Sequence, residues 1–224
     1  MTKRTWTLLG IGVVISTVAA VRFGGWAVVT VEKVPDHWTV GKPLQLAFQV
    51  RQHGTHHMEG LHPVVQATSG SRTIKAVTWE FREDGVTGYR ARLNFPQSGD
   101  WQVTINSGFG KSRAVLLPWR VVDSTAPALA DFPEAERGRR LFAAKGCVTC
   151  HVHKAVDVEG ELQRFGPDLT TRRFPADYLA KFLANPSIKP TAAGMMQMPD
   201  PQLRDKDIAP LVAFINSDRW LSSR

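Results

Sequence analysis

Three residues in the C-terminal half of the chain have types and a spacing that could do chemistry together: Cys147, Cys150 and His151, in the order Cys-Val-Thr-Cys-His. Two thiols three positions apart, with an imidazole directly after the second, form the attachment motif of a c-type haem. Each thiol adds to a vinyl group of the porphyrin as a thioether, and the imidazole becomes the proximal ligand of the iron. A zinc site is the alternative, but it needs about four ligands, and no second Cys or His pair follows at similar spacing. The motif therefore predicts one covalently attached haem c.

A haem of this kind needs a helical enclosure, and the sequence around the motif predicts three helices. Their expected ranges are 138–146, 175–183 and 206–221. Apolar residues recur at helical spacing on the first and last of these, and Gly138 would let the two cross closely, with Phe142 and Phe214 filling the contact. Pro210 interrupts the last helix, because it has no N–H to donate to the carbonyl of Lys206. That helix is therefore expected either to begin late or to kink at the proline.

From about Pro133 to the C-terminus, the order helix, Cys-x-x-Cys-His, Gly-Pro-x-Leu, helix, Met-Pro, helix resembles a small class I cytochrome c. The resemblance implies an all-α haem domain over residues 134–224, with Met198 as the sixth ligand of the iron beside His151. It also implies that the carbonyl of Pro167 accepts a hydrogen bond from His151. That bond would fix the orientation of the imidazole and raise its basicity.

Three methionines lie close together in this region: Met195, Met196 and Met198. A single methionine most often fills a gap in a core, but three in so short a segment of a haem domain make ligation by one of them the expectation. Met198 is preferred because it precedes Pro199, as the ligand does in the cytochromes that this region resembles. Met195 and Met196 remain its competitors.

Residues 24–122 are expected to form a second domain, an all-β sandwich of the immunoglobulin type. Seven runs rich in valine, threonine and aromatic residues alternate with turn clusters at the interval typical of such sandwiches. The runs are 26–33, 43–50, 63–68, 73–81, 88–95, 100–106 and 113–122. The last hairpin, from Phe95 to Val103, resembles those of immunoglobulin-like domains in bacterial copper-handling and oxidase-assembly proteins. Residues 123–133 show no periodic pattern and are expected to be a linker, so that the two domains fold separately.

Four histidines and a methionine gather between the second and third of these runs. They are His53, His56, His57, Met58 and His62. Imidazole and thioether groups together suit copper, because thioethers favour Cu(I) and imidazole accepts either oxidation state. The segment is therefore a candidate copper site, although it also fits an exposed loop or one that packs on the neighbouring domain. A further histidine, His153, is expected to face the solvent.

Lys3 and Arg4 are followed by an uncharged stretch from Thr5 to Val21 that ends in small residues. This layout predicts that residues 1–20 are a signal peptide or, because the stretch reaches the lower limit for crossing a bilayer, a membrane anchor. Either outcome places the protein in the periplasm or an equivalent extracytoplasmic space, which is where haem is attached to cysteines.

The formal net charge of +8 is spread along the chain, without the stripe of lysine and arginine that nucleic-acid binding requires. It fits either steering toward an acidic redox partner or a solvated surface without a role. No residues suggest a catalytic acid, base or nucleophile, so the sequence predicts a carrier or electron-entry subunit and not an enzyme. Its partners would be redox proteins, such as a terminal oxidase or another membrane complex. The alternatives are a copper-handling accessory protein with the haem as electron supply, and an open-site haem that binds gases or peroxide.

Overall fold

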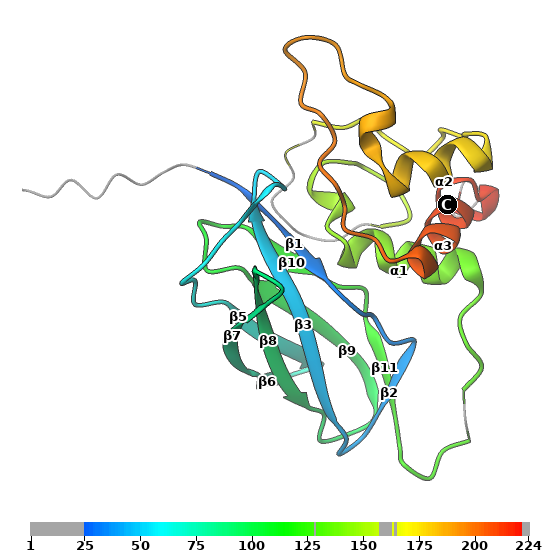
Figure 1. Ribbon diagram of the computed structural model, residues 1–224. Helices are drawn as coiled ribbons and strands as arrows, with labels where there is room; N and C mark the ends of the chain where they lie inside the picture. The colour runs from blue at the N-terminus through cyan, green and yellow to red at the C-terminus, as the bar shows by residue number, and fades with distance from the viewer. Residues whose placement is uncertain (1–24, 128, 157–162, 164, 221–224) are drawn as a thin grey trace, which may run out of the picture.

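The computed structural model describes residues 25–127, 129–156, 163 and 165–220. The expected signal or anchor segment, residues 1–20, lies outside them. The chain forms a β-sandwich up to residue 122, the sandwich domain, and then three α-helices from residue 134 onward, the helical domain, at one end of the sandwich (Figure 1). Both fold classes expected from the sequence are therefore confirmed. Within the described residues, no helix is long and apolar enough to cross a membrane.

The sandwich domain consists of two sheets. One has the order β1-β3-β8-β7 with β4 beside β3, and the other has the order β2-β11-β9-β5-β6 with β10 beside β9. This is the arrangement of an immunoglobulin sandwich, in which strands A, B, E and D face strands C, F and G. The strands are β1 (Ala27–Val31), β2 (His37–Thr39), β3 (Pro43–Gln52), β4 (His56–His57), β5 (Val64–Ser69), β6 (Arg72–Lys75), β7 (Val77–Glu83), β8 (Val86–Asn94), β9 (Gly99–Asn106), β10 (Arg113–Val115) and β11 (Trp119–Val122).

All seven predicted runs contain strands, with two differences in how they divide. The run 73–81 divides at Ala76 into β6 and β7, which belong to different sheets, and the run 113–122 divides into β10 and β11. Strands β2 and β4 lie outside the predicted runs. They have three and two residues, too few for an alternating pattern to show in the sequence.

Strand β1 is buried along its whole length. Ala27, Val29 and Val31 belong to the sandwich core, as the alternation of side chains along a strand requires. Thr30 points the other way, and its hydroxyl donates a hydrogen bond at 3.4 Å to the carbonyl of Lys145 in the helical domain. The outer face of β1 is therefore covered by the helical domain.

The helical domain contains helices α1 (Glu134–Ala144), α2 (Ala176–Ala184) and α3 (Asp205–Ile215), with the short 3₁₀ helices η1 (Cys147–Thr149), η2 (Pro186–Ile188) and η3 (Asp218–Trp220). Helices α1 and α3 cross at Gly138, where a β-carbon would collide with the carbonyl of Pro210. Phe142 and Phe214 fill the crossing, with their ring centroids 5.5 Å apart. The predicted close crossing is confirmed.

Helix α3 begins at Asp205 and continues through Pro210, so of the two expectations for this helix the late start is wrong. Its first turn is fixed by Asp207, whose carboxylate accepts a hydrogen bond from the backbone N–H of Arg204 at 3.2 Å. The carbonyl of Pro210 is the group that lies against Gly138. The proline therefore occupies the closest approach of the two helices.

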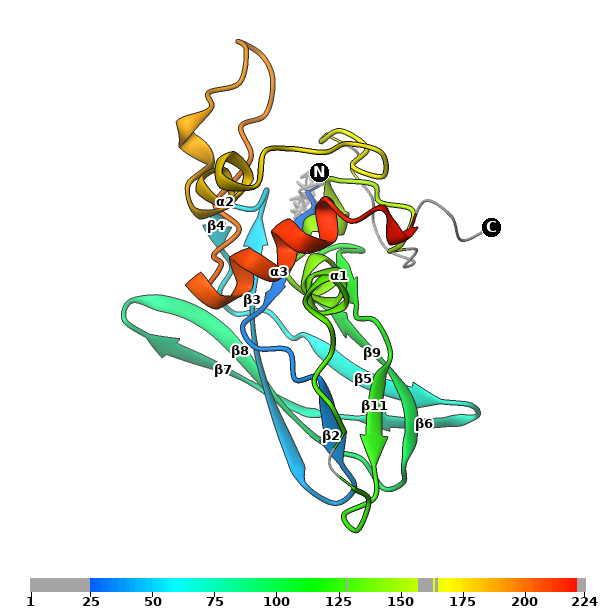
Figure 2. The ribbon, with the colours of Figure 1, turned by 90° about the vertical axis from the view of Figure 1, so that its right-hand side faces the viewer.

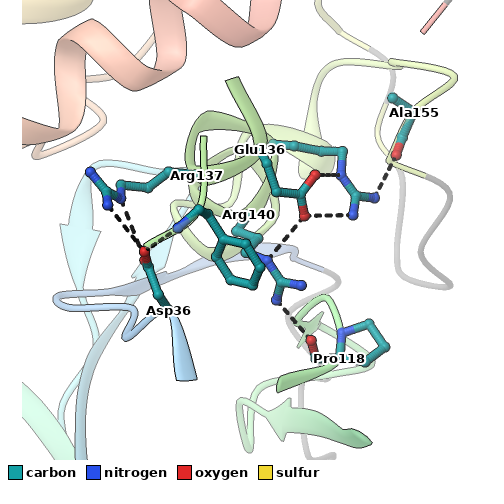
Figure 3. Close-up of polar contacts among 8 residues, drawn as sticks. Asp36, Pro118, Glu136, Arg137, Arg140 and Ala155 are labelled. Atoms are coloured by element: carbon teal, nitrogen blue, oxygen red, sulfur yellow. Dashed lines mark hydrogen bonds and ion pairs between the residues drawn. The ribbon is translucent and has the colours of Figure 1, made fainter. Parts of the chain in front are cut away.

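The start of helix α1 is tied to the sandwich domain by an ion pair and hydrogen bonds (Figure 3). The carboxylate of Asp36 accepts from the guanidinium of Arg137 at 3.0 Å and from the backbone N–H of Phe132 at 2.9 Å. Arg140 donates to the carbonyl of Pro118 at 2.7 Å. Since Phe132 belongs to the segment predicted as a linker, the end of that segment is fixed between the domains.

Candidate haem-binding site

A cavity of about 450 Å³ collects the residues of the predicted haem site. Both motif cysteines, His151 and all three methionines line it, together with apolar side chains of the three helices. Those apolar side chains are Phe142, Leu179, Phe182, Leu183, Leu211 and Ile215. Residues that are far apart in the sequence thus share one largely apolar cavity, which is the environment that a porphyrin needs.

The way in which helix α1 ends positions the Cys-x-x-Cys-His motif. Gly146 adopts a left-handed conformation with φ 78°, and its N–H donates to the carbonyl of Ala143 at 3.2 Å, as at many helix C-termini. The chain then turns through η1, and the N–H of His151 donates to the carbonyl of Cys147 at 2.9 Å. This turn brings both cysteines and His151 to the same cavity.

The two thiols are held in their neutral form. Burial raises the pKa of Cys147 to about 12 and that of Cys150 to about 11. Reactive cysteines have the opposite environment, in which nearby positive charge lowers the pKa of the thiol. Among the described residues, no group of three or more His, Cys, Asp or Glu side chains could hold a metal ion. The environment therefore does not favour a zinc site or a redox pair at these two cysteines.

His151 has the orientation and the protonation state that an iron ligand requires. The expected hydrogen bond is present, since Nδ1 lies 3.0 Å from the carbonyl of Pro167. Because a carbonyl can only accept, Nδ1 carries the hydrogen and Nε2 keeps its lone pair. Burial lowers the pKa of His151, although the Pro167 carbonyl opposes this, so the ring is neutral at pH 7. Gly166 lies so close to the ring that a β-carbon at this position would collide with it.

The methionines lie in residues 189–204, a segment without helix or strand that we call the methionine loop. Met195 and Met196 are 66% and 44% exposed, whereas Met198 is half-buried and packs against the helical core. The side-chain amide of Gln197 anchors the loop by donating to the carbonyl of Pro186 at 3.0 Å. Burial therefore favours Met198 over its two neighbours as the ligand.

Two residues of the sandwich domain, Val28 and Arg51, also line the cavity, and the sequence did not predict either. Arg51 is 2% exposed, although it follows the core residue Val50 on β3 and so lies on the outer face of its sheet. An arginine at such a position is expected to face the solvent. The side chain of Arg51 is buried because the two domains pack together, and no local pattern in the sequence predicts such a contact.

The predicted copper site is not supported. His53, His56 and His62 are exposed, His57 is half-buried, and Met58 packs against the sandwich core. These side chains therefore have separate surroundings. They also contribute to no candidate metal-binding group in the part of the chain that the structure describes.

The segment that contains these histidines packs on the helical domain instead, which is one of the alternatives for it. A β-carbon on Gly54 would lie 2.6 Å from the ring of Pro199, so the backbone here touches the methionine loop. His57 Nε2 lies 3.3 Å from the side-chain nitrogen of Gln202 in the same loop. Figure 2 shows β4, which contains His57, at the end of the sandwich that faces the helical domain.

His153 is buried, so the expectation that it faces the solvent is wrong. It is 2% exposed, and its ring centroid lies 4.3 Å from that of Phe214 and 6.0 Å from that of Phe142. Burial and, to a smaller extent, the nearby Arg173 lower the pKa of His153 to about 4. The neutral ring is therefore part of the core beside the crossing of α1 and α3.

Comparison with known proteins gives the class of the helical domain. The sequence model of the family described as Cytochrome c matches residues 135–218, which identifies this region as a cytochrome c domain. No curated protein sequence matches the chain. Solved structures with a similar arrangement include the ZirS C-terminal domain, with 6% identity over 55% of this chain and 86% of that chain at a TM-score of 0.31. The Lin-41 filamin domain matches with 11% identity over 47% of this chain and 91% of that chain at a TM-score of 0.26.

Proposed function

We propose that this protein is a monohaem electron carrier, with one haem c attached to Cys147 and Cys150 and its iron held by His151 and Met198. The observation that carries the proposal is the apolar cavity that collects these four side chains within a cytochrome c domain. When bound, the haem supplies reversible one-electron chemistry at its iron. The protein would act as a carrier or as the electron-entry subunit of a redox complex, and not as an enzyme.

The residues around the cavity have distinct tasks in this proposal. The carbonyl of Pro167 holds the imidazole of His151 in one orientation and makes it a stronger donor to the iron. The thioether of Met198 favours ferrous iron and so raises the reduction potential. The leucines and phenylalanines of the lining exclude water, which lowers the local dielectric constant and further tunes the potential.

We also propose that the protein works in the periplasm or an equivalent space, exported or anchored by residues 1–20. The covalent attachment of haem supports this location, since that reaction takes place outside the cytoplasm. The formal net charge of +8 supports an acidic redox partner, because opposite charge steers the encounter of two proteins. A terminal oxidase or another membrane complex would fit as such a partner.

An optical spectrum and a redox titration of the full-length, haem-loaded protein test the proposal. We expect a low-spin ferric spectrum with the weak far-red band of a thioether–iron bond, and one reversible one-electron transition. A high-spin ferric spectrum without that band, together with tight binding of carbon monoxide by the reduced protein, would contradict the carrier function. Such a result would favour the open-site haem protein.

A further inference from the structure

Besides its anchor at Gln197, the methionine loop is held from outside the helical domain. The guanidinium of Arg51, on β3 of the sandwich domain, donates from Nη1 to the carbonyl of Asp200 at 2.7 Å. Asp200 is two residues after Met198 in the sequence. The same nitrogen donates to the carbonyl of Gly54 at 2.7 Å, and Nη2 donates to the hydroxyl of Thr30 at 3.0 Å. Arg51 is therefore fixed within its own domain and reaches into the next.

A second contact acts on the same loop. Gly54 lies against the ring of Pro199, the residue directly after Met198, so closely that a β-carbon on Gly54 would be 2.6 Å from it. Gly54 can approach this closely because it has no side chain, and its φ of 78° is one that glycine adopts readily. Two neighbouring residues of the loop are thus held by one turn and one arginine of the sandwich domain.

The sandwich domain also holds the other side of the cavity. Lys145, two residues before Cys147, donates from Nζ to the carbonyl of Glu32 at 3.0 Å and forms a buried ion pair with Asp207 at 3.0 Å. Gly146 lies against Val28, and a β-carbon there would collide with it. Strands β1 and β3 therefore contact the chain just before the cysteine motif and just after the predicted methionine ligand.

We propose that the sandwich domain is part of the haem site, and that Arg51 is a positioning residue that keeps the thioether of Met198 on the iron. The proposal rests on the ligation of iron by Met198 that the proposed function contains. Residues 189–204 have no helix or strand to fix them, and the anchor at Gln197 lies before Met198. The part of the loop after Met198 can therefore move away from the cavity unless another contact opposes it. The hydrogen bond from Arg51 to the carbonyl of Asp200 and the packing of Pro199 on Gly54 are the contacts that oppose this movement.

The strength of methionine ligation can be measured by adding imidazole to the full-length ferric protein. Imidazole binds the iron only when Met198 is displaced, so its apparent affinity reports the fraction of protein in the open state. In Arg51→Met we expect this affinity to rise about tenfold to a hundredfold, the range expected for the loss of a hydrogen bond with a charged partner. Arg51→Lys keeps the positive charge and three N–H donors but lacks the planar fork that reaches Gly54, Asp200 and Thr30 together, so it should fall between wild type and Arg51→Met.

Matched variants distinguish a positioning role of Arg51 from the loss of a positive charge and from a loss of domain stability. Arg72→Met removes an exposed arginine of the same domain, on β6, and should bind imidazole as the wild type does. Val65→Ala weakens the sandwich core without touching Arg51 and should leave imidazole binding unchanged while it lowers the stability of the domain. Gly54→Ala crowds Pro199 directly and should raise the imidazole affinity as Arg51→Met does.

Each result decides between distinct conclusions. If Arg51→Met and Gly54→Ala bind imidazole with wild-type affinity while Met198→Ala binds it much more tightly, Arg51 does not position the loop, and the carrier function stands. If Arg51→Met and Val65→Ala raise the affinity for imidazole equally, Arg51 acts only through the general stability of the protein, and the proposal is overturned. If Met198→Ala itself leaves imidazole binding unchanged, the ligand assignment in the proposed function is wrong.

Discussion

The two segments that line the haem cavity are held in different ways. The segment Cys147–His151 follows directly from helix α1, is folded by a turn of its own backbone, and has its histidine fixed by Pro167. All of these contacts lie within the helical domain. The methionine loop has no regular structure and takes its contact with Arg51 from a residue 149 positions away in the sequence.

In the proposed function, this difference separates an iron ligand fixed by local structure, His151, from one fixed in addition by domain packing, Met198. The first depends on helix termination, a 3₁₀ turn and one nearby carbonyl, all within the helical domain. The second depends in addition on the position of the sandwich domain. The sandwich domain also contacts Lys145 and Gly146, just before the motif, but it makes none of the contacts named above that fold the motif itself. We therefore expect changes at Arg51 and Gly54 to act on the methionine side of the cavity and to leave the cysteine and histidine side in place.

The largest expected effect is on the cysteine side. Replacing both motif cysteines, Cys147→Ala with Cys150→Ala, should abolish covalent haem completely, because the chain has no other cysteine to form a thioether. Denaturing gels stained for haem peroxidase activity measure this directly, with the wild-type protein and Met198→Ala as positive controls. Haem that still migrates with the double variant would contradict the attachment site.

On the methionine side, Met198→Ala should keep the covalent haem but remove the sixth ligand. The far-red band should disappear and the reduction potential should fall by on the order of 0.1 V, within the roughly 0.8 V that axial ligands span. The controls are Met195→Ala and Met196→Ala, which remove more exposed side chains and should leave the spectrum nearly unchanged. A high-spin spectrum from Met196→Ala would transfer the ligand role to that residue.

Separating the two domains should give an intermediate effect. Residues 132–224 alone, exported and matured with haem, should keep the covalent attachment and His151 ligation. Without Arg51 and Gly54, the methionine loop loses two of its contacts, so imidazole should bind the ferric domain more tightly than it binds the whole protein. Identical spectra and imidazole affinities in both proteins would show that the helical domain fixes both ligands by itself.

Much of this cavity follows from patterns in the sequence, because its parts have local signals. The glycine that lets two helices cross predicts the contact at Gly138 that the structure contains. The resemblance of the Gly-Pro-x-Leu segment to that of a class I cytochrome c implies the His151–Pro167 hydrogen bond, which is also present. Most strands of the sandwich domain follow from runs rich in valine, threonine and aromatic residues between turn clusters, whereas β2 and β4 are too short to be predicted.

The domain interface could not be predicted, since its contacts join residues with no pattern in common. Arg51 sits at an outward position of its strand, and the histidines beside it suggest a metal site where the structure has a packing surface. The same holds for His153, which a one-dimensional pattern cannot distinguish from a solvent-facing histidine. Only the crossing of α1 and α3 places Phe142 and Phe214 around it.

The smallest expected effect is the pH dependence that His153 gives to the helical domain, and it tests how rigidly the histidine side is packed. The pKa of His153 is about 4 in the folded protein, against an ordinary value of 6.5. The unfolded chain therefore takes up the proton first as the pH falls, so stability is lost between pH 6.5 and pH 4 and levels off below that. The full loss is about 3 kcal/mol by linkage. Denaturant unfolding of the haem-loaded protein at pH 7 and pH 5 covers about 2 kcal/mol of this loss, and His153→Phe, which cannot titrate, should remove most of the difference. An equal loss in both proteins would mean that other groups cause the acid sensitivity.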